Sequence, residues 1–326
     1  MTVRKFPFAT AALLLVASSI PAAAAREPDV LWRDPGPIQS RDLFYGPGGK
    51  RNQPPPGTFT FVKEDLKGTN PKLIVRDRNG VRWKVKLGIE ARPETAASRI
   101  VWAAGYFADE DYFIERLRVE GLPPRLHRGQ KFVTPDGFVS NARLKRQPPG
   151  TENEGTWSWR DDPFTGTREL NGLRVVMALI NNWDLKDENN KIRDNGRERR
   201  YLVTDLGASF GTPGRSWPFH KERGDLESYS RAPLYRKISG SEVDFRAPGR
   251  PKFVFLVNPL EYIRHVHLEW VGHRIPREDA RWIGRLLAQL SHRQVEDAFR
   301  AAKYSPQEVD GFSKALERRI AQLSDL

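Results

Sequence analysis

The first half of the chain shows the alternation of apolar and polar residues that is typical of β-strands. Residues 72–76 and 81–87 alternate in this way, and the dipeptide Asn79-Gly80 between them favours a tight hairpin turn. Residues 131–146 carry the pattern of further strands. This part of the chain is therefore predicted to be rich in β-structure.

Helical spacing of apolar residues interrupts the strands once and then dominates the end of the chain. At 92–106, Pro93 suits a first helical turn, and small and branched apolar residues recur on one face. Residues 168–181 predict a second helix with a buried apolar stripe. Three more helices are predicted at 277–290, 292–302 and 306–323, the last two headed by the capping boxes Ser291–Gln294 and Ser305–Glu308.

The order of these elements predicts an α+β fold of two lobes. Residues 58–157 would form a β-rich N-lobe with one helix, and residues 158–326 a mostly helical C-lobe. The loop 147–157, rich in Pro, Gly and Glu, is the best internal boundary. Residues 26–57 read as a Pro/Gly-rich N-terminal arm, either lying on the domain or forming a loose leader. A chain of 326 residues can bury a sizeable core.

The N-terminus carries the pattern of a secretory signal peptide, assigned to residues 1–25. Arg4 and Lys5 precede a short apolar run at 11–20, and alanines at 23–25 provide small residues for cleavage. We therefore expect an exported protein, periplasmic or secreted, without a transmembrane helix in the mature chain; a retained N-terminal anchor is the alternative. No cysteine follows the run to accept a lipid, so a lipoprotein is not expected.

Charge and composition limit the classes of binding partner that we expect. The chain has 54 Lys and Arg residues against 41 Asp and Glu, a formal net charge of +13, which favours phosphate groups, nucleic acid or an anionic envelope surface. Because the basic residues are scattered and do not interleave with aromatic residues along one stripe, nucleic acid is not the partner we expect. The absence of cysteine excludes disulfide frameworks, iron–sulfur clusters and thiol nucleophiles.

Candidate chemistry lies in the loop 182–189 and just after the strand that follows it. Asp184 and Asn189 stand five residues apart in this loop, and Asp205 follows the next predicted hairpin. Phosphoryl transfer needs a carboxylate that orients the attacking hydroxyl, and oxygen ligands that hold magnesium on the phosphates. Lys186 can offset charge on the transferred group. Asp184 and Asn189 also fit Asx turns that satisfy the loop backbone.

The same residues carry a resemblance to protein kinases. The run from Asp184 to Asn189, DLKDEN, resembles the kinase catalytic loop D-L-K-x-x-N, and Asp205-Leu206-Gly207 resembles its D-F-G. Lys86 at a strand end and Glu94 opening a helix are similar to the lysine–glutamate pair that positions nucleotide phosphates. The surroundings resemble the atypical branch of this superfamily, which includes the HipA, phosphoinositide and secreted CotH-type kinases, with this chain an exported bacterial member.

The resemblance implies a kinase-like fold and a set of roles. Asp184 and Lys186 would be catalytic, Lys86 and Glu94 would bind the nucleotide, and Asn189 with Asp205 would hold the metal. The implied activity is phosphoryl transfer from ATP, with Mg²⁺ or Mn²⁺, to an unknown hydroxyl on a protein, sugar or lipid headgroup. The alternative is a catalytically inactive, kinase-shaped scaffold that binds an anionic ligand or partner in the cell envelope.

Several positions stay open on the sequence alone. Lys84 shares a strand face with Lys86, so either could pair with Glu94, and Glu94 also suits a charge at a helix N-terminus. The segment 67–70 is the candidate phosphate loop, with a single glycine. Three histidines, His265, His267 and His273, could form a metal cluster. Three loop residues, Asp187, Glu188 and Asn190, are interpreted as solvated.

Overall fold

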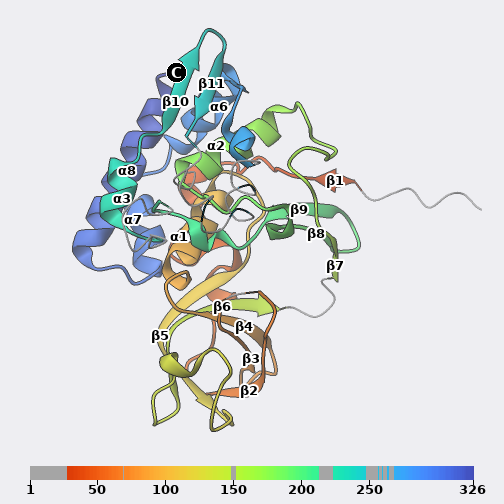
Figure 1. The fold of residues 1–326 in the computed structure, drawn as a ribbon, viewed down its shortest axis with the longest axis vertical. Coiled ribbons are helices and arrows are strands. Elements are labelled where there is room, and N and C mark those ends of the chain that lie inside the picture. The colour runs from red at the N-terminus through yellow and green to blue at the C-terminus, as the bar shows by residue number, and fades with distance from the viewer. Residues whose placement is uncertain are drawn as a thin grey trace, which may run out of the picture.

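The computed structural model describes residues 28–68, 70–147, 152–212, 223–246 and 268–326, together with the single positions 256, 259 and 263. The predicted signal peptide therefore lies outside the described residues. The α+β class and the two lobes are confirmed: a closed β-barrel forms one lobe, and the other lobe is mostly helical with two small sheets (Figure 1). No helix among the described ranges is long and apolar enough to cross a membrane.

The β-rich lobe is a closed barrel of five strands in the order β2-β3-β4-β6-β5. Alternation decides its two faces, because Trp83 and Val85 fill the barrel interior while their neighbours along the strand point outward. The predicted hairpin at Asn79-Gly80 joins β3 to β4 in antiparallel register. The strands are β2 (Phe59–Glu64), β3 (Lys72–Arg76), β4 (Arg82–Leu87), β5 (Asp111–Glu120) and β6 (Phe138–Gln147).

The helix α1 (Ala91–Ala103) lies between the two lobes. It packs against β5 and β6 on one side and against α7 of the helical lobe on the other. Ala97, Ile100 and Val101 are fully buried, so α1 has little of the solvated face of a surface helix. A charged side chain on this helix is therefore enclosed by both lobes.

The helical lobe ends the chain as the sequence predicts. Ser291 and Ser305 each head a helix with a complete capping box, in which the side chain accepts from the backbone three residues on. The helices are α2 (Arg168–Leu179), α3 (Leu226–Arg231), α6 (Arg277–Leu287), α7 (His292–Ala301) and α8 (Pro306–Ser324). Short 3₁₀ turns include Asp187–Asn189 and Leu206–Ala208.

Two small sheets accompany these helices. One has the order β1-β9-β8-β7, formed by β1 (Asp29–Val30), β7 (Glu152–Gly155), β8 (Asn190–Asp194) and β9 (Arg199–Val203). The other has the order β10-β11-β12, formed by β10 (Tyr235–Ser239), β11 (Glu242–Phe245) and β12 (Ile275–Pro276). The β8–β9 hairpin positions part of the candidate site, because one candidate residue comes just before its first strand and another shortly after its second.

The N-terminal arm, from residue 28 to 57, contacts both lobes. The Trp32 indole donates to the carbonyl of Ala104 at 2.8 Å, beside the end of α1. Ile38 is fully buried, and its carbonyl accepts from the Gln294 amide of α7 at 3.0 Å. On the barrel side, the Tyr112 hydroxyl donates to the carbonyl of Gly49 at 2.9 Å. The arm is thus part of the packed structure over these residues.

Candidate active site

Lys86 is the centre of a buried ion cluster at the junction of the lobes. Alternation along β4 places its side chain outside the barrel, facing α1, and leaves it only 3% exposed. Its Nζ lies 3.1 Å from Glu90 Oε2 and 2.8 Å from Glu94 Oε2. It also bonds Asp205 Oδ1 of the helical lobe. One ammonium group therefore joins the strand, the helix and the segment after β9.

Glu94 uses its second oxygen to extend this cluster into the barrel. Its Oε1 accepts from the Arg143 guanidinium of β6 at 2.8 Å, and Arg143 in turn lies 3.1 Å from Asp111 Oδ1. All three side chains are nearly inaccessible to solvent. Glu94 does stand in the first turn of α1, but that turn is enclosed, so it acts in a buried ion pair and not as a solvated charge at a helix end.

The cluster sets the charge states of Lys86 and Asp205. Burial alone would lower the pKa of Lys86, but Glu94, Asp205 and Glu90 together raise it above its ordinary value. Burial raises the pKa of Asp205, but Lys86 outweighs it, by charge and hydrogen bond, and holds that pKa at about 2. At neutral pH the cluster therefore contains an ammonium group and ionised Asp205.

Asp205 is held in an unusual backbone conformation. Its φ of 57° and ψ of 47° lie in the left-handed region, which costs a non-glycine residue roughly 1–2 kcal/mol. Its carboxylate bonds Lys86, and its side chain is 43% exposed to solvent. Two residues on, a Cβ at Gly207 would stand 2.6 Å from Glu90 Cβ, so only glycine lets this segment approach α1 so closely.

Buried apolar residues alternate with charged residues in the Asp184 loop. Trp183 and Leu185 are buried, which leaves Asp184 and Lys186 on the opposite, partly accessible side. Asp184 Oδ1 lies 2.8 Å from Lys186 Nζ. The Trp183 amide donates to the carbonyl of Ala208 at 3.3 Å, so this loop is bonded directly to the segment that follows Asp205.

Asn189 links the loop to Asp205 through the β8–β9 hairpin. Its Nδ2 donates to the carbonyl of Asp184 at 2.8 Å, so its Oδ1 is the atom left for a further ligand. The amide and the hydroxyl of Thr204 both donate to the carbonyl of Asn189, each at 2.8 Å. Because Asn190 opposes Val203 at the open end of the hairpin, Asn189 and Asp205 follow neighbouring strand ends.

The predicted site residues thus fall into two connected groups. Lys86, Glu94 and Asp205 are in direct contact, and Asp184, Lys186 and Asn189 share one loop that is hydrogen-bonded to the Asp205 segment. Among the described residues no group of three or more His, Asp or Glu side chains could hold a metal ion by itself. Asp205 and Asn189 nevertheless fit Mg²⁺ or Mn²⁺, since magnesium commonly takes few protein oxygens and completes its shell with phosphates and water.

The structure also answers some open points. Lys86 is the lysine that pairs with Glu94, whereas Lys84 bonds Asp65 at 2.8 Å. The interpretation of Asn190 as solvated is wrong: Asn190 is the first residue of β8, and its side chain is fully buried and donates to the carbonyl of Trp157 at 3.0 Å. His265 and His267 lie outside the described residues.

Three residues of the buried ion cluster were not predicted from the sequence, namely Glu90, Arg143 and Arg223. Glu90 accepts from Asn70 Nδ2 at 2.5 Å, bonds Lys86, and meets the Arg223 guanidinium at 2.8 Å. Its spacing of four from Lys86 was a signal that could have been used. Arg143 and Arg223 gave no signal, because strand alternation places Arg143 away from the barrel core, where a solvated arginine would be expected, and Arg223 is remote in sequence.

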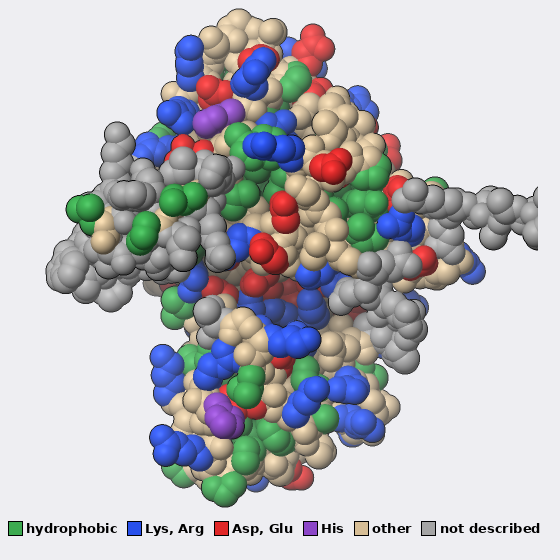
Figure 2. All heavy atoms as spheres, turned by 45° about the vertical axis from the view of Figure 1, so that its right-hand side comes forward, with side chains coloured by type: hydrophobic (Ala, Val, Ile, Leu, Met, Phe, Trp, Pro, Cys, Tyr) green, Lys and Arg blue, Asp and Glu red, His purple; other side chains and the backbone are tan. Residues whose placement is uncertain are grey.

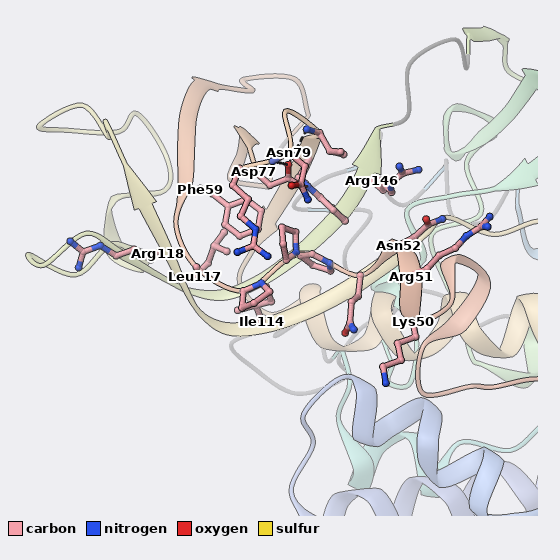
Figure 3. A pocket seen from close by; sticks show the side chains of 18 of the residues that line it. Lys50, Arg51, Asn52, Phe59, Asp77, Asn79, Ile114, Leu117, Arg118 and Arg146 are labelled. Carbon is pink, nitrogen blue, oxygen red and sulfur yellow. Dashed lines mark hydrogen bonds between the residues drawn. The ribbon is translucent and has the colours of Figure 1, made fainter.

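A hollow lined by acidic and basic side chains separates the lobes (Figure 2). A cavity of about 330 Å³ lies beside this junction, with Lys84, Lys145 and Arg193 among its lining residues. A larger cavity of about 710 Å³ lies between the arm and the barrel, and Phe59, Trp83 and Leu117 of the barrel interior help to line it. There Arg51 and Arg146 lie at one end and Arg118 at the other (Figure 3), and none of the predicted site residues lines it.

Comparison with known proteins gives similarity at the level of fold. No protein-family model matches the chain, and no curated protein matches its sequence. Among solved structures, the chain is similar to a Helicobacter pylori proinflammatory kinase, CtkA, with 11% identity and a TM-score of 0.45, over 83% of this chain and 96% of that one. It is also similar to a Golgi casein kinase, with 10% identity and a TM-score of 0.44, over 84% of this chain and 73% of that one.

Proposed function

We propose that this chain is a kinase-like phosphotransferase that moves a phosphoryl group from ATP to a hydroxyl acceptor. One observation carries the proposal: a buried strand lysine, Lys86, contacts both a helix glutamate, Glu94, and the carboxylate of Asp205, while the Asp184 loop is bonded to the same segment. Phosphoryl transfer depends mainly on positioning and on electrostatic stabilisation, and this set of side chains supplies both.

The protein's own residues have distinct tasks in this proposal. Asp184 would accept the hydrogen bond of the substrate hydroxyl and orient its oxygen for attack. Lys186, 2.8 Å from Asp184, would offset negative charge on the transferred group. Lys86, held in place by Glu94, would contact the donor's phosphates. The side chains of Asp184 and Lys186 are 21% and 37% exposed, so a substrate can reach them.

Asp205 and Asn189 are the residues that would hold a divalent ion. When bound, such an ion would supply positive charge that offsets the negative charge developing on the phosphates. The partly exposed Asp205 carboxylate and the free Oδ1 of Asn189 provide the hard oxygen donors that the ion requires.

The first test measures the melting temperature of the protein with and without Mn-ATP. A ligand at about 100 times its dissociation constant stabilises the fold by roughly 2.7 kcal/mol, a rise of several degrees. We expect this rise in the wild type and its loss in Asp205→Ala. An equal rise in both proteins would contradict the metal assignment. No rise in the wild type would instead favour the inactive, anion-binding scaffold.

The second test separates binding from transfer. Asp184→Ala should keep the Mn-ATP shift but lose transfer of labelled phosphate, either to a mixture of protein, sugar and lipid acceptors or to water. Asp187→Ala is the matched control, because Asp187 lies in the same loop and its carboxylate only accepts a backbone hydrogen bond from Trp159 at 3.3 Å. Loss of transfer in the control as well would argue against a specific role for Asp184.

The finer features of the proposal rest on the sequence. These are membership of the atypical kinase branch and export by way of residues 1–25, supported by the basic, apolar and small-residue pattern there. Fractionation of cells that express the full chain would test export: protein found only in the cytoplasm, at its full mass, would refute it.

A further inference from the structure

The face of the barrel that is turned toward the helical lobe carries several cations around Lys86. Register defines two rows across the sheet, in which directly opposed side chains share a face about 5 Å apart. Lys72, Lys86 and Arg143 form one row, and Lys84 and Lys145 form the next. The residues between them along β4, such as Val85, point into the barrel.

The helical lobe adds cations from the other side of the junction. Lys191 and Arg193 lie two residues apart on β8 and so share a face of that strand. Arg193 lies 2.5 Å from Asp109 Oδ1, and Lys145 of the barrel lies 2.7 Å from Asp109 Oδ2. Basic side chains from the two lobes therefore meet at one carboxylate.

Two of these lysines lack a carboxylate partner among the residues that the structure describes. Lys72 is half-buried and faces Lys86 across the strands, with no ion pair to it. Lys191 Nζ donates to a backbone carbonyl, that of Glu188, at 2.7 Å. Burial lowers the pKa of both, and neighbouring cations lower it further: Lys84 for Lys72, and Lys145 for Lys191. Both ammonium groups would therefore gain from an added anion.

Recognition of a nucleobase calls for a different surface. Small-molecule pockets are lined mainly by apolar and aromatic side chains, with a few polar groups that fix orientation. Here the positions beside Lys86 on the two neighbouring strands are Lys72 and Arg143, and the apolar neighbour across from Lys84 is Ile74. Lysine binds phosphate as a point charge, so this surface suits phosphate groups.

We infer that this cleft recognises its donor by an oligophosphate chain and not by the base attached to it. The inference rests on the proposed function, whose donor site it specifies. The chain of phosphates could be carried by a nucleoside or be an inorganic chain, and both would meet the same lysines from β3, β4 and β8.

Calorimetric titration of the whole protein with Mn²⁺ salts distinguishes these donors. Inorganic tripolyphosphate should bind within about threefold of ATP, and adenosine should neither bind nor compete. If ATP binds more than about thirtyfold tighter than tripolyphosphate, or if adenosine competes, the base is read and the inference is wrong, while the proposed function stands. If neither ATP nor tripolyphosphate binds, both fail.

Substitution of the unpaired lysine tests the assignment of the surface. Lys72→Gln should weaken tripolyphosphate and ATP to the same extent, about tenfold for the loss of one charged contact. Lys237→Gln is the control, because this exposed lysine lies on β10 in the hairpin at the far end of the helical lobe (Figure 1). A melting temperature of Lys72→Gln no lower than the wild type shows that it folds. Unchanged tripolyphosphate affinity in Lys72→Gln would overturn the inference.

Discussion

Replacing Lys86 by methionine should destabilise the protein in a way that depends on pH. Methionine keeps the length and apolar stem of the side chain but removes the charge that Glu90, Glu94 and Asp205 share. Glu94 would retain its bond to Arg143, but the three carboxylates would lose the cation between them. Two of the three, Glu90 and Glu94, are almost fully buried and cannot be solvated instead.

The expected cost follows from that burial. Breaking a buried ion pair by removing one partner costs about 3–5 kcal/mol. The Asp205 side chain is 43% exposed, so water screens its share, and most of the loss comes from Glu90 and Glu94. In a chain of this size such a loss lowers the melting temperature by roughly 10 °C. Typical stabilities of about 5–15 kcal/mol leave the variant folded.

The pH dependence gives the sharper signature. In the wild type the pKa of Asp205 is held at about 2, so its stabilisation is present above about pH 4 and is lost as the pH falls toward 2. Lys86→Met lacks this contribution at every pH, so its deficit relative to the wild type should be smaller at pH 3 than at pH 7.

Thermal unfolding followed by circular dichroism at pH 3 and pH 7 measures this difference. Lys84→Met is the matched control: Lys84 lies two residues away on β4, is 28% exposed and pairs with Asp65, so its loss should cost under about 1 kcal/mol. A Lys86→Met protein as stable as the control at pH 7, or a deficit equal at both pH values, would refute the role of Lys86 as the shared cation.

Two further substitutions test how the site segment and the arm are held. Gly207→Ala should lower the free energy of unfolding, measured by denaturant titration, by about 1–3 kcal/mol, because the added Cβ would stand 2.6 Å from Glu90 Cβ; a free energy equal to that of the wild type would mean that this close packing is absent. Gln294→Ala should lose a capping contact and the hydrogen bonds from its Nε2 to the carbonyls of residues 38, 39 and 41, whereas Glu308→Ala should lose only a capping contact. Hydrogen exchange in the arm should therefore accelerate at residues 38–41 in Gln294→Ala and not in Glu308→Ala; equal exchange in the two would contradict the docking of the arm by Gln294.

The spacing of the loop residues was readable because it is local. Asp184, Lys186 and Asn189 lie within six residues, and the burial of Trp183 and Leu185 leaves the side chains of Asp184 and Lys186 partly accessible. The choice between Lys84 and Lys86 was not readable, because both share one strand face and their distance to α1 depends on how the helix packs. The burial of Asn190 was equally a matter of packing, since loop composition does not show that this residue begins β8 with its side chain enclosed.

Local signals predict the main elements and their order, because hydrophobic period, turn dipeptides and capping residues act over a few residues: the Asn79-Gly80 hairpin, α2, and the capped helices at Ser291 and Ser305 all follow from them. The ion pairs of the site, in contrast, depend on tertiary packing and do not follow from local sequence. Arg143 and Asp205 reach Glu94 and Lys86 across long stretches of chain, and the cost of burying one of these ions is met only when the others are enclosed with it. That balance depends on the packing of two lobes around α1, which no window of sequence contains.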